Sequence, residues 1–162
     1  MQSKVNLFGH PLHAILVDFP IVLYPALVGL DLLWRLYGNE AFWVVGFWLA
    51  AAGAVSALAA IVTGTVDLAF IPDASRAHKT ALWHFLLGCA ILALYGGSVV
   101  VRLPLNSVST ASLSATAGVA LDVVGLLFVV VQGYLGGELV GRHHIGVRSM
   151  DEGADPVVLS RH

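Results

Sequence analysis

The chain has 162 residues, of which 58% are hydrophobic and only 11% are charged, and its mean hydropathy is +0.86. This balance lies far outside that of a soluble domain and indicates an integral membrane protein. The formal net charge of −2 provides no basic surface, which excludes nucleic-acid binding. The single cysteine, Cys89, excludes an intrachain disulfide and a cluster of thiolate metal ligands.

Four apolar stretches are each long enough to cross a hydrocarbon core of roughly 30 Å, which takes about 20 residues. They are Leu12–Tyr37, Phe42–Phe70, Ala77–Val101 and Ala111–Leu139. Short connections rich in turn-forming residues separate them and make neighbouring helices antiparallel. The sequence therefore predicts an all-α, up-and-down four-helix membrane bundle over residues 1–146, followed by a polar tail over 147–162. No internal repeat of useful strength is evident.

Both termini of such a bundle lie at the same end, called side A here, and the opposite end is called side B. Six basic residues fall on side A and two on side B, and the positive-inside rule places the more basic side in the cytoplasm. The chain is therefore predicted to be a multi-pass protein of the cell membrane, surrounded by the lipid bilayer, with both termini cytoplasmic. The side A residues are Lys4, Arg76, Lys79, Arg142, Arg148 and Arg161, and those of side B are Arg35 and Arg102.

Small residues recur every three or four positions in the second and fourth stretches. Such faces let helix backbones approach closely in lipid, which predicts helix packing for the second stretch. In the fourth stretch the same spacing includes Asp122 and Gln132, so this polar seam is predicted to face the bundle interior. The second stretch carries Gly46, Ala50, Gly53, Ala57 and Gly64, and the fourth carries Gly118, Gly125 and Gly136.

Polar residues of all four helices are predicted to share one depth near side A. At 1.5 Å per residue, Asp18 and His84 each lie about 10 Å into their helices. Asp67 and Gln132 reach similar depths, and His10 lies at the mouth of this layer. Because ionised aspartates are costly in a membrane and usually mark function, the layer is a candidate site. A structural hydrogen-bond cluster that only fixes the helix register is the alternative.

Other polar residues have simpler interpretations. Asp31 and Arg35 are four residues apart near side B, which is the spacing of an ion pair on a helix surface. His78 is interpreted as a solvated loop residue, and the roles of His143 and His144 are left open.

The opening GHPLHAILVDFPI resembles the Gly-His-Pro-Leu-His-Pro…Phe-Pro-Ile signature of domain-of-unknown-function family 2231, whose members are predicted four-span membrane proteins. TGTVDL, RAHKTALWH and LGGELVGRHHIGV also resemble that family's pattern, so the likeness covers nearly the whole chain. Two positions depart from it: Ala14 stands where the family often has a second proline, and Asp18 where a further histidine is common. The family has no firmly assigned activity, although fusion of members to Rieske-type or cytochrome-type domains associates it with redox work.

The leading functional hypothesis is a membrane protein that binds b-type haem and transfers electrons. Four-helix bundles house cofactors between facing helices, and histidine is an axial haem ligand. His13 and His84 would supply imidazoles across the bundle, with His10 and Gln132 beside the cofactor. This hypothesis implies a redox partner protein.

Two alternatives remain. The first is a divalent-metal or permeation site for Zn, Mn or Fe, because mixed imidazole and carboxylate ligands suit these ions. Its predicted ligands are His10, His13, Asp18, Asp67 and His84. The second is a non-catalytic membrane scaffold or partner subunit, and a homo-oligomer is also left open. No nucleophile motif is recognisable, so the sequence indicates no class of enzyme.

Overall fold

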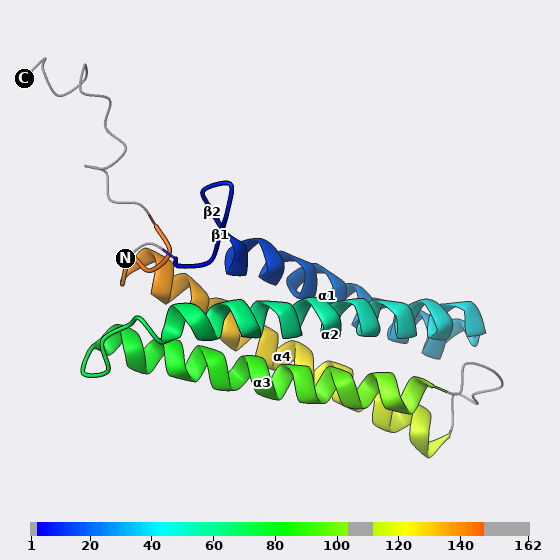
Figure 1. Cartoon of the computed structure of the whole chain (residues 1–162). Helices are drawn as coiled ribbons and strands as arrows, with labels where there is room; N and C mark the ends of the chain where they lie inside the picture. Colours follow the sequence, from blue (N-terminus) through cyan, green and yellow to red (C-terminus); the bar gives the residue numbers. More distant parts are fainter. Residues whose placement is uncertain (1–2, 104–111, 148–162) are drawn as a thin grey trace, which may run out of the picture.

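The computed structural model describes residues 3–103 and 112–147 (Figure 1). Most of this part forms four long helices: α1 (Leu12–Tyr37), α2 (Glu40–Leu68), α3 (Arg76–Arg102) and α4 (Leu113–Gly141). Consecutive helices run antiparallel, and α1 and α3 stand diagonally opposite each other, each packed against α2 and α4. The predicted all-α four-helix membrane bundle is confirmed. The predicted tail, apart from Val147, lies outside the described residues.

Each helix is long and apolar enough to span a membrane. α1 has the predicted bounds, whereas α2, α3 and α4 differ from their predicted spans by one or two residues at each end. Polar side chains cap the first turn of each of these three helices and set where it begins. Asn39 Oδ1 accepts the N–H of Ala41 at 3.0 Å, so α2 begins before the first apolar residue. Ser75 and Ser112 cap α3 and α4 in the same way, and Gly38, with a φ of 66°, ends α1 in the left-handed region.

The outer surface of the bundle is apolar. Leu32 on α1, Val55 on α2, Leu86 on α3 and Val130 on α4 are all exposed. In a water-soluble bundle these residues would lie in the core, whereas lipid is as apolar as the side chains themselves. The exterior is therefore suited to hydrocarbon on every side.

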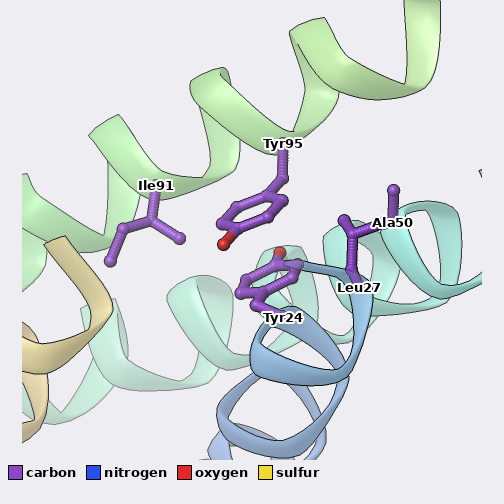
Figure 2. Close-up of a cluster of buried hydrophobic side chains, with 5 residues drawn as sticks. All are labelled: Tyr24, Leu27, Ala50, Ile91 and Tyr95. Atoms are coloured by element: carbon purple, nitrogen blue, oxygen red, sulfur yellow. The ribbon is translucent and has the colours of Figure 1, made fainter. Parts of the chain in front are cut away.

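The centre of the bundle is a stacked pair of tyrosines from the two diagonally opposed helices (Figure 2). The rings of Tyr24 and Tyr95 lie 3.5 Å apart between centroids and are parallel to within 2°. Leu27, Ala50 and Ile91 complete this buried cluster. Rings at this separation require the helix backbones beside them to come close, which explains the small residues of α2 and α4.

The two helical hairpins, α1–α2 and α3–α4, repeat the same contacts. Tyr24 packs against Gly53, where an added Cβ would overlap its Cε1 atom. Tyr95 packs in the same way against Gly125, where an added Cβ would lie 2.6 Å from its Cε2 atom. The interval from Tyr24 to Tyr95 along the chain nearly equals that from Gly53 to Gly125, so the bundle is built from two hairpins of similar design. The sequence did not reveal this repeat, because the two halves share few identical residues.

Candidate functional site

The two histidines predicted as a pair lie opposite each other across the bundle near side A. His13 opens α1 and His84 lies about two turns into α3, and these two helices run in the same direction. Their imidazole ring centroids are 6.1 Å apart, with an angle of 75° between the ring planes. The structure therefore brings these two side chains together from diagonally opposed helices.

Each imidazole is anchored through Nδ1 to a backbone carbonyl of a neighbouring helix. His13 Nδ1 lies 2.7 Å from the carbonyl oxygen of Ala60, and His84 Nδ1 lies 3.1 Å from that of Gln132. A carbonyl oxygen only accepts, so Nδ1 carries the proton and, in the neutral ring, Nε2 keeps a free lone pair. Within residues 3–103 and 112–147, Nε2 of neither ring has a hydrogen-bond partner.

Glycines make room for both rings. A Cβ added to Gly64 would lie 2.8 Å from His13 Cε1, and one added to Gly136 would lie 3.3 Å from His84 Cε1. Each ring thus turns its Nδ1–Cε1 edge towards the helix that anchors it, α2 for His13 and α4 for His84. Nε2, which is bonded to Cε1, lies farther than Cε1 and Nδ1 from the Cβ positions of these glycines.

The glycines beside the two imidazoles belong to the repeated design of the hairpins. Gly136 follows Gly64 by the same interval along the chain as Gly125 follows Gly53. The glycines that accommodate the imidazoles therefore occupy equivalent positions of α2 and α4, as do those that accommodate the tyrosines.

Gln132 forms two hydrogen bonds with His84. In addition to accepting through its backbone, it donates from Nε2 to the carbonyl oxygen of His84 at 3.3 Å. The side-chain amide lies over Gly88, where an added Cβ would be 2.8 Å away. The predicted inward orientation of the polar seam on α4 thus holds at this position.

Both imidazoles line a cavity of about 530 Å³ that reaches Tyr24 and Ile91 at the centre of the bundle. Its walls come from all four helices and are mainly apolar or small. Within the helices, the lining residues that are exposed belong to α1 and α4, so the cavity opens sideways between these two helices. These exposed residues are Ala14, Ile21, Gly133, Gly137 and Val140.

Asp67, at the rim of the cavity, links the end of α2 to the segment before α1. Its carboxylate accepts the hydroxyl of Ser3 and the backbone N–H of Lys4, both at 2.7 Å. These bonds hold the segment that leads into a small hairpin of β1 (Asn6–Leu7) and β2 (His10–Pro11). His10 is exposed in this hairpin.

Asp18 does not belong to the polar layer predicted near side A. Its side chain is exposed, and it is absent from the cavity wall, where α1 contributes His13 instead. Asp18 lies about 140° around the helix from His13 at the usual step of an α-helix. The structure places His13 opposite His84, about 7.5 Å nearer the start of α1 than Asp18, and it turns the side chain of Asp18 outwards.

The five predicted metal ligands do not form one cluster. In residues 3–103 and 112–147, no group of three or more His, Cys, Asp or Glu side chains is placed to hold a metal ion. The arrangement near side A is a pair of imidazoles in an apolar cavity, with the acidic residues engaged elsewhere or facing outwards.

Comparison with known proteins supports the resemblance seen in the sequence. A family model described as a predicted membrane protein, DUF2231, matches residues 9–149. The chain belongs to this family. No curated protein and no solved structure matches the chain. The DUF2231 description names no activity, so the function of this member is argued from its own site geometry.

This DUF2231 protein also holds a buried charged cluster near side B. Arg102 Nη2 donates to Asp31 Oδ1 at 2.5 Å and to Asp122 Oδ2 at 2.6 Å, and all three side chains are at most 1% exposed. Ser98 links the cluster further: it donates to Asp122 Oδ2 at 2.9 Å and accepts from Arg102 Nε at 3.2 Å. The ring of Trp43 lies 4.1 Å from the guanidinium carbon, a cation–π contact.

The predicted surface ion pair between Asp31 and Arg35 is wrong. Asp31 lies on the buried face of α1 and pairs with Arg102, whereas Arg35 donates to Thr116 Oγ1 at 3.1 Å. The four-residue spacing suggested a local pair, but tertiary packing turns Asp31 inwards.

A shared spacing in the sequence indicates these buried partners. Asp31 follows His13 by the same interval as Arg102 follows His84. This interval makes about five whole helical turns, so each pair lies on one face of its helix. Since His13 and His84 face each other, Asp31 and Arg102 must do so about 27 Å further along the bundle.

Proposed function

We propose that this protein binds one haem b in the cavity between His13 and His84 and transfers electrons through it. The observation that supports the proposal is the distance of 6.1 Å between the two imidazole centroids. Two imidazoles that bind one metal through nitrogen bonds of about 2 Å have ring centres roughly 5 to 6.5 Å apart. The spacing therefore suits two axial ligands of one iron.

The anchoring of the rings supports the same proposal. Histidine ligands usually donate the other ring N–H to a carbonyl or carboxylate, which fixes the ring orientation and makes the ligating nitrogen more basic. His13 and His84 both do so, through the carbonyls of Ala60 and Gln132. The ligand set is thus oriented before a cofactor arrives.

The walls of the cavity suit a flat, apolar macrocycle. Gly64 and Gly136 present backbone instead of side chains beside the two rings, and the opening between α1 and α4 gives a broad molecule room to extend. Carboxylates close to a porphyrin would be unfavourable, but Asp18 faces outwards and Asp67 is bonded to Ser3. A redox partner protein would exchange electrons with the haem.

One optical experiment tests the proposal. The protein is produced with haem supplementation, purified in detergent, and its spectrum is recorded oxidised and after dithionite reduction, alongside metal analysis. We expect a Soret band and sharpened visible bands on reduction. His13→Ala and His84→Ala should each lose most of the bound haem because one axial ligand is removed.

His10→Ala is the matched control, because His10 is exposed in the hairpin before α1, outside the cavity wall. It should leave the spectrum unchanged. A wild-type sample with no Soret absorption after supplementation rules out the proposal. Bound divalent metal without a Soret band would point instead to the metal-site alternative.

We also infer that both termini face the cytoplasm, so that the haem site lies near the cytoplasmic surface. Six basic residues lie on side A and two on side B, and this charge asymmetry supports the orientation. A reporter enzyme that is active only outside the cytoplasm should be silent when fused after His162. The same reporter inserted after Leu103 should be active, and the reverse pattern would invert the assigned orientation.

A further inference from the structure

The buried cluster near side B contains one carboxylate more than its guanidinium can neutralise. Asp31 and Arg102 occupy equivalent positions of the two hairpins and would form a neutral pair alone. Asp122 has no such counterpart, because the interval that relates Gly53 to Gly125 places Ala50 at the equivalent position of α2. The third charge is thus an addition to the repeated design, at a buried position where an unpaired charge is costly.

The two carboxylates accept hydrogen bonds from the same nitrogen atom. Asp31 Oδ1 and Asp122 Oδ2 both accept from Arg102 Nη2, at 2.5 Å and 2.6 Å. The two oxygens therefore lie within about 5 Å of each other, a distance at which a second negative charge in a buried site strongly disfavours the first. Two carboxylates held this way resolve the repulsion when they share one proton.

The cluster also has polar atoms in need of partners. Asp31 Oδ2, Asp122 Oδ1 and Arg102 Nη1 are buried without a hydrogen-bond partner in the described part of the chain. The hydroxyl of Tyr24 and Nε1 of Trp43, close by, are in the same condition. A proton on one carboxyl oxygen supplies a donor in a group that otherwise only accepts.

We propose that Asp31 and Asp122 share one proton, so that the cluster with Arg102 is a proton-binding site without net charge. The groups facing it come from every helix: Asp31 and Tyr24 from α1, Trp43 from α2, Tyr95, Ser98 and Arg102 from α3, and Asp122 from α4.

The proton site is connected to the histidine cavity through the tyrosine pair. Tyr95 donates its hydroxyl to the backbone carbonyl of Asp122 at 3.0 Å, and its ring stacks on Tyr24, which lines the cavity (Figure 2). A charge placed in the cavity is therefore separated from the cluster by two stacked rings. The inference of a proton site rests on the excess of two carboxylates over one guanidinium and does not require that haem be bound.

Infrared spectroscopy of the protein in lipid nanodiscs tests the proposal. At neutral pH the wild type should show the carbonyl stretch of a protonated carboxyl group, which shifts when aspartate is carbon-13 labelled and when the sample is deuterated. Asp31→Asn and Asp122→Asn should each abolish the band, because the remaining carboxylate then forms a one-to-one ion pair with Arg102. Asp18→Asn, an exposed aspartate outside the cluster, should leave the band unchanged.

The loss of the band in both single variants separates a shared proton from a carboxyl group that is protonated by burial alone. Survival of the band in either variant overturns the proposal, and so does the absence of a labelled band from the wild type. Circular dichroism establishes whether the asparagine variants fold. If they do not, the absence of a labelled band from the wild type still overturns the proposal.

Discussion

Replacement of Arg102 by methionine is expected to lower the free energy of unfolding by about 3–5 kcal/mol, the usual cost of leaving a buried charge without its partner. Arg102 is fully buried and bonds to Asp31, Asp122 and Ser98. Methionine fills much of the volume of arginine but offers no donor, so the negative charge of the aspartate pair is left buried without its cation. Reversible unfolding in mixed detergent micelles, followed by circular dichroism, measures the loss.

The matched control is Arg142→Met at the end of α4. Arg142 forms an exposed i,i+4 ion pair with Glu138 at 3.3 Å, and such pairs contribute less than about 1 kcal/mol. Replacement of Arg102, Asp31 and Asp122 together by apolar residues should restore much of the stability, because no uncompensated charge remains. Equal unfolding midpoints for Arg102→Met and Arg142→Met would contradict the structural role of the cluster.

The fold was accessible from the sequence because membrane helices must satisfy their own backbone hydrogen bonds. Apolar stretches of sufficient length therefore predicted four helices, and short connections predicted their antiparallel order. The helix ends were less certain because hydropathy does not register caps such as Asn39, which admits the charged Glu40 into the first turn of α2.

The candidate site was accessible only in part. His13 and His84 were paired because both lie near side A and both are possible axial ligands, whereas the count of residues along the helices placed Asp18 level with His84. Asp18 was misplaced because a count of residues does not give the direction of a side chain around the helix, which follows from the angular step of roughly 100° per residue. Asp31 was misassigned because its spacing of four residues from Arg35 indicated a local ion pair. Its position about five turns after His13 places it on the same face of α1 as His13.

Alanine at Gly53 or Gly125 is expected to lower the free energy of unfolding by about 1–3 kcal/mol each, through overpacking. An added Cβ would overlap Tyr24 Cε1 at the first position and would lie 2.6 Å from Tyr95 Cε2 at the second. Neither ring can retreat, because each is stacked on the other with 3.5 Å between centroids. The unfolding midpoint in detergent should therefore fall for both variants and by similar amounts.

Gly29→Ala and Gly96→Ala are the matched controls, since an added Cβ at either position meets nothing within 4 Å. These two changes should leave stability unchanged or raise it slightly, because alanine favours the helix by about 1 kcal/mol over glycine. The double variant of Gly53 and Gly125 pushes the two tyrosines towards each other, so its loss should exceed the sum of the single losses. Strict additivity would show that the rings relax independently and that the two hairpins do not meet through this stack.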